Sequence, residues 1–191
     1  MDAEGVCQVL ARLAEDEDKY VRGGVARNKN IPSRCARDIL SKLSTDKTRY
    51  VRRGVARNKY ICKQCVCDIL GKLSTDEDAD VRESVAWNKN IPDQCACDLL
   101  GILSIDKDEN VRYGVAEKSG IPEQCVCDIL GKLVIDEDKY VRGGVAQNIG
   151  IPEQCACDLL SKLSTDDNWS VRNGVARNPL WEKCKEDGHG R

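Results

Sequence analysis

The sequence predicts an all-α solenoid of about six two-helix repeats, each 30 residues long. The segment VRGGVARN at residues 21–28 returns five times with substitutions, always at an interval of 30 residues. Relatives of IPSRCARDILSKLSTD (residues 31–46) lie between these copies, and their apolar residues recur at helical spacing. Strands have little support, because apolar and polar residues alternate weakly. Two short helices cannot bury their apolar faces alone, so the pairs must stack.

The first helix of a repeat is expected to begin near a proline, because proline is favoured in the first helical turn. The prolines at this place are Pro32, Pro92, Pro122 and Pro152. After Pro32, the apolar residues Ala36, Ile39 and Leu43 fall on one helical face, which we expect to be buried.

The second helix is shorter and carries the VRxxVA segment. Residues that suit a helix N-cap precede its six copies, namely Asp18, Thr48, Asp78, Asp108, Asp138 and Asn168. An asparagine such as Asn28 follows five of the copies and suits a left-handed C-cap, although Lys118 breaks this column. We expect residues 1–182 to form a single solenoid domain and residues 183–191 to form a C-terminal tail.

The unit IPxxCxxDILxKLSxDxxxxVRxxVAxN resembles the repeat of the leucine-rich repeat variant family over nearly the whole chain. The resemblance implies a right-handed superhelix of stacked helices without strands. The unit also resembles HEAT repeats, in which an Asp and an Arg six residues later form a ladder, as at Asp16 and Arg22. This unit is longer than the family's, and the family's Asn–Pro dipeptide is found only at Asn178–Pro179. The iron–sulfur cluster of the family's founding member lies on a separate N-terminal segment and is not carried over.

Composition and charge disfavour several classes of function. The net charge of −2 argues against a surface for polyanions, so nucleic acid is not the expected partner. No apolar run approaches the length needed to cross a membrane. The N-terminal residues MDAEGVCQVLARL lack the basic region and apolar block of a signal peptide, which favours the cytoplasm. An extracellular or other oxidising compartment is expected instead if the cysteines form disulfides.

Most of the twelve cysteines fall in two columns of the first helix. At about 100° per residue, these columns lie on opposite shoulders of the apolar face, one toward each neighbouring repeat. Cα atoms that face each other across packed helices come within roughly 5 Å, which is inside the disulfide range. Where Arg37 interrupts one column, Cys62 replaces the repeat's proline. The possible disulfides are therefore Cys7–Cys35, Cys62–Cys65, Cys67–Cys95, Cys97–Cys125, Cys127–Cys155 and Cys157–Cys184. Reduced thiols that pack as small apolar side chains remain the alternative.

Metal binding by the cysteines has weaker support than disulfide formation or packing as reduced thiols. Structural zinc needs four converging ligands, whereas CxxC spacing occurs here only at Cys62 and Cys65, and the one histidine, His189, lies in the tail. We therefore expect no cofactor and no metal. Cys62 and Cys65 are the alternative site for a metal, an iron–sulfur cluster or redox chemistry, because the start of a helix favours a thiolate.

Four columns on the second helix and its exit vary between repeats, and we call them the variable stripe. In the first copy they hold Tyr20, Gly23, Arg27 and Asn30, whose spacing follows one side of a helix. All five tyrosines of the protein fall in the variable stripe, together with Trp87. Aromatic residues and arginine are enriched at recognition surfaces. The predicted binding residues are Tyr20, Arg27, Tyr50, Arg53, Arg57, Tyr60, Asp80, Glu83, Trp87, Tyr113, Glu117 and Tyr140.

These observations predict a non-enzymatic repeat protein that binds a protein or peptide, or acts as a scaffold, through the variable stripe. No nucleophile–base set and no phosphate loop is recognisable, and the recurring Asp and Arg are expected to be structural. The charge of the stripe changes from basic near Arg53 to acidic near Glu83, which suits a partner with complementary patches. One alternative is a nucleic-acid-binding solenoid in which tyrosines stack on bases. The other is a redox-active or metal-binding solenoid. The oligomeric state is unknown.

Overall fold

The structure, a computed structural model, describes residues 2–186, which contain thirteen α-helices and no strand. These residues divide into two compact units, with the boundary between Cys95 and Ala96, which we call the N-terminal and C-terminal units. The first unit holds α1 (Ala3–Leu13), α2 (Lys19–Ala26), α3 (Ser33–Leu43), α4 (Arg49–Ala56), α5 (Val66–Leu73) and α6 (Ala79–Ala86). The boundary falls within α7 (Asp93–Leu103). The second unit continues with α8 (Glu109–Ala116), α9 (Glu123–Leu133), α10 (Lys139–Gln147), α11 (Glu153–Ser164), α12 (Trp169–Arg177) and α13 (Pro179–Glu186).

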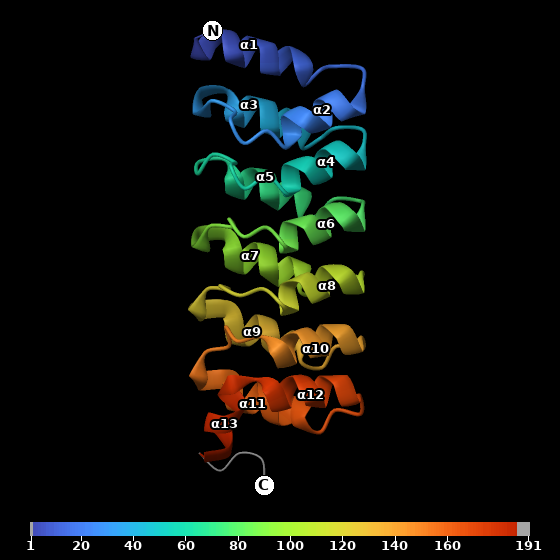
Figure 1. The fold of residues 1–191 in the computed structure, drawn as a ribbon, viewed down its shortest axis with the longest axis vertical. Helices are drawn as coiled ribbons and strands as arrows, with labels where there is room; N and C mark the ends of the chain where they lie inside the picture. Colours follow the sequence, from blue (N-terminus) through green and yellow to red (C-terminus); the bar gives the residue numbers. More distant parts are fainter. Residues whose placement is uncertain (1, 187–191) are drawn as a thin grey trace. The chain divides into compact units, whose positions relative to one another are not determined.

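Within each unit, first and second helices form separate columns (Figure 1). In the N-terminal unit α2, α4 and α6 pack in succession, and α1 packs against α3. In the C-terminal unit α8, α10 and α12 pack in succession, while α11 packs against both α9 and α13. The predicted all-α arrangement of stacked two-helix repeats is confirmed, whereas the handedness of the superhelix stays a prediction.

The buried core repeats with the sequence. The first helix of a repeat contributes two leucines, such as Leu70 and Leu73, and the second contributes two valines, such as Val51 and Val55, all of them fully buried. Burial of each such side chain contributes about 1.5–3 kcal/mol. No described helix is both long and apolar enough to cross a membrane.

Five of the six second helices begin at the predicted N-cap with a side-chain hydrogen bond. Asp18, at the N-cap of α2, accepts a hydrogen bond of 2.7 Å from the backbone N–H of Tyr20, and its counterparts at α6, α8, α10 and α12 accept similar bonds. Thr48 differs, because its hydroxyl donates to Asp46 Oδ1 at 2.7 Å. Cys62 stands where four of the other repeats have proline, and α5 begins four residues later, at Val66.

A ladder of arginines and aspartates joins second helices to the turns that precede the second helices of the next repeats. Arg52 donates through Nε and Nη2 to the two carboxylate oxygens of Asp76 in the next repeat, at 2.7 and 2.9 Å. Its Nη1 donates to the backbone oxygen of Asp46 in its own repeat at 2.9 Å. The same bidentate geometry joins Arg22 to Asp46, Arg112 to Asp136 and Arg142 to Asp166. These are charge-assisted bonds between buried or half-buried side chains, so their role is structural.

A second ladder is built from the asparagine column and corrects the expected C-cap. Asn58 donates through Nδ2 to the backbone oxygens of Ala26 and Asn28 in the preceding repeat, at 2.8 and 3.2 Å. Its Oδ1 accepts from the backbone N–H of Tyr60 at 2.8 Å. No residue other than glycine has a positive φ in the described part of the chain, so the asparagines are not left-handed caps. Asn88, Asn148 and Asn178 make the equivalent bonds.

The last described helix occupies part of the expected tail. Residues 183–186 belong to α13, and Cys184 and Trp181 of this helix are buried. Residues 187–191, with His189, lie outside the described residues.

Candidate functional site

The second helices of the N-terminal unit approach one another closely, and residues of the variable stripe lie beside this contact. A Cβ added at Gly54 of α4 would lie 3.1 Å from the Cβ of Ala26 in α2, so a small residue at this position allows the close packing. Ser84 takes the same place on α6, and its hydroxyl donates to the backbone oxygen of Asp80 at 2.7 Å. The framework thus holds the variable side chains on neighbouring helices at short range.

Three residues of the stripe form an aromatic and cationic cluster on α2 and α4. The rings of Tyr20 and Tyr50 meet edge to face with centroids 5.4 Å apart. The guanidinium of Arg27 lies 4.6 Å from the centroid of the Tyr50 ring and donates to its hydroxyl. Gly23 makes room for this arrangement, because a Cβ there would overlap the Tyr50 ring. Tyr20 remains 62% exposed, whereas Tyr50 is half-buried.

The arginines on and just after α4 differ in how closely they approach polar side chains on and just before α6. Arg49 lies 3.1 Å from Asp78 and 3.7 Å from Asp80, between side-chain nitrogen and oxygen atoms. Arg53 reaches Asp80 only at 3.7 Å. Arg57, one turn further along, donates through Nε to the Ser84 hydroxyl at 3.2 Å. Arg53 Nε is buried and has no hydrogen-bond partner.

Several of these side chains border a groove between α2 and α4, which we call the arginine groove. It is lined by Arg27, Tyr50, Arg53, Gly54 and Arg57 and has a volume of about 150 Å³. No carboxylate is among its lining residues. Its chemistry is therefore that of a small cationic site with an aromatic wall.

The remaining predicted residues of the N-terminal unit lie further along the stripe. Tyr60 is 52% exposed, on the segment after α4, and the ammonium of Lys59 lies 5.6 Å from its ring centroid. Trp87 is 38% exposed at the C-cap of α6. Glu83 is half-buried on the same helix. The structure does not place Tyr60, Glu83 or Trp87 in the arginine groove.

In the C-terminal unit, acidic side chains lie beside the tyrosines of the stripe. Tyr113 on α8 donates to a carboxylate oxygen of Glu117 at 2.5 Å. Burial raises the pKa of Tyr113 to about 12, helped by this hydrogen bond and the charge of Glu117, so the phenol stays protonated near neutral pH. A second groove, of about 210 Å³, is lined by Glu109, Asn110, Tyr113, Asp138 and Tyr140, and we call it the acidic groove. Tyr140 is 64% exposed at its edge.

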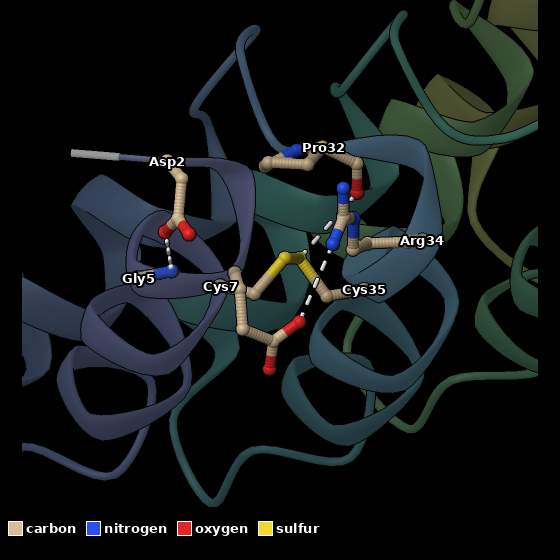
Figure 2. Close-up of a disulfide and its surroundings, with 7 residues drawn as sticks. Asp2, Gly5, Cys7, Pro32, Arg34 and Cys35 are labelled. Atoms are coloured by element: carbon tan, nitrogen blue, oxygen red, sulfur yellow. Dashed lines mark hydrogen bonds and ion pairs between the residues drawn. A yellow bond between two sulfur atoms is a disulfide. The ribbon is translucent and has the colours of Figure 1, made fainter.

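The twelve cysteines lie in six pairs at disulfide distance, and these are the six pairs expected from the sequence. Their Cα atoms are 5.2 to 6.0 Å apart. The pair Cys7–Cys35 joins α1 to α3, and Figure 2 shows Arg34 beside it. Arg34 forms an ion pair of 3.3 Å with Glu4. Four further pairs join first helices of successive repeats in the same way, namely Cys67–Cys95, Cys97–Cys125, Cys127–Cys155 and Cys157–Cys184.

One step of this cysteine ladder is missing, between α3 and α5. Arg37 replaces the cysteine and reaches α5 through an exposed contact of 3.4 Å with the Asp68 carboxylate. Cys65, which is fully buried, pairs with Cys62 instead, with Cα atoms 5.4 Å apart. No group of three or more metal-ligating side chains occurs within residues 2–186, so Cys62 and Cys65 gain no further ligand there.

No protein-family model matches the chain, and no curated protein matches it in sequence. Solved structures do match. A leucine-rich repeat variant protein with a repetitive structural motif has 24% identity and a TM-score of 0.56, covering 92% of this chain and 72% of that one. An engineered protein has 19% identity and a TM-score of 0.56, covering 97% of this chain and 98% of that one.

A chain of the S. pombe condensin Cnd3–Cnd2 subcomplex has 18% identity and a TM-score of 0.62 over 98% of this chain and 28% of that one. At these identities the likeness concerns the fold alone. The resemblance expected from the sequence is confirmed at that level: the chain has the stacked-helix repeat fold of a leucine-rich repeat variant protein.

Proposed function

We propose that the chain is a non-enzymatic module that binds a protein or peptide through the variable stripe. The observation that carries this proposal is where the exposed aromatic side chains lie. Tyr20, Tyr60 and Trp87 in the N-terminal unit and Tyr140 in the C-terminal unit are exposed on the stripe. Tyr, Trp and Arg side chains are enriched among the hot spots of protein interfaces.

The framework residues support the proposal, because their polar groups are used inside the fold. In both ladders, buried side chains such as Arg52 and Asn58 form hydrogen bonds with the neighbouring repeat. The stripe is where side chains differ between repeats, and in a solenoid such columns adapt to a ligand. A structurally similar chain belongs to a subcomplex of condensin subunits, which is an assembly of proteins. This likeness agrees with a binding role and identifies no partner.

Peptides selected from a random display library against the intact chain test the proposal. The substitutions Tyr20→Ala, Tyr60→Ala and Trp87→Ala, combined in one variant, are expected to weaken binding of the selected peptides at least about tenfold, since one hot-spot residue contributes about 2 kcal/mol or more. The control variant combines Ile105→Ala, Ile135→Ala and Trp169→Ala, which are exposed apolar residues outside the stripe. Selected peptides that bind both variants as tightly as the unchanged chain contradict the proposal.

A further inference from the structure

We infer that the arginine groove binds a carboxylate side chain of an acidic peptide. This inference rests on the proposed function and adds the chemical class of the ligand. Three guanidinium groups, those of Arg27, Arg53 and Arg57, border a space of about 150 Å³ that no carboxylate of the protein lines. Guanidinium groups bind carboxylates through paired, charge-assisted hydrogen bonds.

Arg53 is the residue whose bonding is incomplete. Its Nε lies buried without a hydrogen-bond partner, and its Nη1 is 3.7 Å from Asp80, too far for a hydrogen bond. A buried donor without a partner destabilises the free protein. Arg53 lines the groove, so a ligand carboxylate there would meet a guanidinium whose hydrogen bonds within the protein are incomplete. The groove therefore differs from the Arg–Asp ladder, in which Arg52 donates through both Nε and Nη2 to Asp76.

The neighbours of Arg53 bring aromatic surface as well as charge. Arg27 is held against the ring of Tyr50, which orients its guanidinium at the edge of the groove. Tyr20 touches Tyr50 edge to face and keeps 62% of its surface exposed. The exposed Tyr20 ring could therefore contact the residues that flank the acidic side chain of a bound peptide.

The charge of the whole N-terminal unit has the sign that an acidic ligand requires. Residues 1–95 carry 18 basic and 15 acidic side chains, and residues 96–191 carry 12 and 17, so their formal charges of +3 and −5 sum to the −2 of the chain. Basic surface raises the rate at which an acidic ligand associates. The competing carboxylate of Asp80 is about half exposed, and exposed pairs contribute little.

An acidic peptide fits better than a nucleic acid. Nucleic acids bind through many phosphates, which requires a basic track along the surface. Here the stripe turns acidic on the next helix, α6, with Asp80 and Glu83. The small groove, in which the hydrogen bonding of Arg53 is incomplete, suits a single carboxylate. Contacts with the neighbouring aromatic rings would add to the affinity for the peptide.

The test measures fluorescence anisotropy with three labelled probes on the intact chain. The first is an amidated dodecapeptide of alternating Glu and Gly, so that only side-chain carboxylates are available. The second has Lys in place of Glu, and the third is a single-stranded DNA of twelve nucleotides. The variants are Arg53→Gln and Arg27→Gln, with Arg34→Gln as the matched control, because Arg34 is an exposed arginine of the same unit outside the groove. Circular dichroism checks that each variant is folded.

We expect Arg53→Gln and Arg27→Gln each to weaken binding of the Glu peptide about tenfold, as loss of a hydrogen bond to a charged group does, and Arg34→Gln to change it less than twofold. Equal losses in all three variants, no loss in any, or no binding of the Glu peptide overturn the inference. Stronger binding of the DNA, lost in the same variants, overturns it in favour of a nucleic-acid ligand.

The two proposals fail in different ways. If display selects peptides that need the aromatic residues of the stripe but contain no Asp or Glu, the proposed function stands and the acidic ligand is wrong. If the selected peptides are indifferent to the aromatic residues, the proposed function fails first.

Discussion

At the scale of single residues, Asn58 shows how one side chain can connect two repeats. Its amide satisfies two backbone oxygens of the preceding repeat and its own oxygen fixes the turn that leads to Tyr60. We expect Asn58→Ala to lower the free energy of unfolding by about 1–3 kcal/mol, because buried carbonyl groups lose their partner. Urea unfolding followed by circular dichroism measures the change. Asn30→Ala, at an exposed asparagine two residues after Asn28, is the control and should change stability by less than about 0.5 kcal/mol.

The Asp46 carboxylate makes stability depend on pH. Burial acts to raise its pKa, but hydrogen bonds from Arg22 and Thr48 outweigh burial and lower the pKa from 3.8 to about 2. A group with a lowered pKa in the folded state stabilises the fold fully above its unfolded pKa and loses this contribution as the pH falls through the folded pKa. Asp46 therefore contributes about 2 kcal/mol at neutral pH, which disappears between about pH 4 and pH 2.

Urea unfolding of Asp46→Asn at pH 7 and at pH 2 measures this contribution. The variant should be less stable than the unchanged chain at pH 7, and the difference should shrink at pH 2. The control Asp38→Asn removes an exposed carboxylate of α3. A stability difference for Asp46→Asn that stays the same at both pH values contradicts the role of the charged pair.

Some residue roles were predictable and others were not. The helix-capping aspartates could be assigned from the sequence, because an N-cap depends on the residue and its immediate neighbours. The role of Asn58 was missed, because its partners lie about 30 residues away and only the stacking of repeats brings them into reach. The incomplete bonding of Arg53 depends on the positions of side chains on α4 and α6, which no local pattern specifies.

At the scale of helices, the cysteine pairs predict two levels of stabilisation. In the chain-entropy model, a pair that closes a loop of about 28 residues, such as Cys127–Cys155, stabilises by about 3–4 kcal/mol, and the short loop of Cys62–Cys65 by about 2 kcal/mol. Chain entropy therefore makes the long-range pairs the stronger constraints.

Thermal unfolding with and without reductant should show this difference. In oxidised protein, the double variant Cys127→Ala and Cys155→Ala should lose more stability than the double variant Cys62→Ala and Cys65→Ala. After reduction, the stabilities of the two double variants should differ less. Intact mass identifies the starting state, because each oxidised cysteine lacks one hydrogen. Twelve reactive thiols in protein unfolded without reductant would show that the pairs are not bonded.

The gap in the ladder between α3 and α5 allows the opposite experiment. Arg37→Cys combined with Cys62→Pro restores the sequence of the sister repeats and leaves Cys65 free to pair with position 37. We expect a new disulfide there and a gain of about 3–4 kcal/mol in oxidised protein, minus the contribution of the Cys62–Cys65 loop. Peptide mapping without reductant identifies the bond, and Cys62→Pro alone is the control. Absence of the bond would show that these helices do not approach as their sister pairs do.

At the scale of the whole molecule, the fold could be predicted because the same sequence pattern occurs six times. Six copies of one pattern identify the buried columns, such as that of Leu70 and Leu100, more securely than a single helix does, because the same choice recurs under different neighbours. The division into two units and the position of the grooves were not foreseen. Both depend on packing between repeats that are alike in sequence, and residues 1–182 as one domain stays a prediction.

The opposite charges of the two units predict that they bind different peptides. The acidic groove places Glu109 and Asp138 beside the rings of Tyr113 and Tyr140, within a unit of formal charge −5. A carboxylate-lined groove with aromatic walls attracts lysine and arginine side chains, through both charge and cation–π contacts. The Lys–Gly dodecapeptide should therefore bind to this unit, and Glu109→Gln should weaken its binding several-fold. Arg53→Gln, in the other unit, should leave it unchanged.

Fluorescence anisotropy at low and at physiological ionic strength measures the affinity of this peptide. Its binding should weaken as salt rises, because exposed charges are screened over about 8–10 Å. Glu123→Gln is the matched control, since Glu123 is an exposed glutamate of the same unit that does not line the groove. If Glu109→Gln and Glu123→Gln weaken binding equally, the peptide responds to the net charge of the unit and the acidic groove has no specific role. If only Glu109→Gln weakens it, the acidic groove is a specific site, and together with an arginine groove that binds the Glu peptide it would allow the protein to hold two segments of a partner that differ in charge.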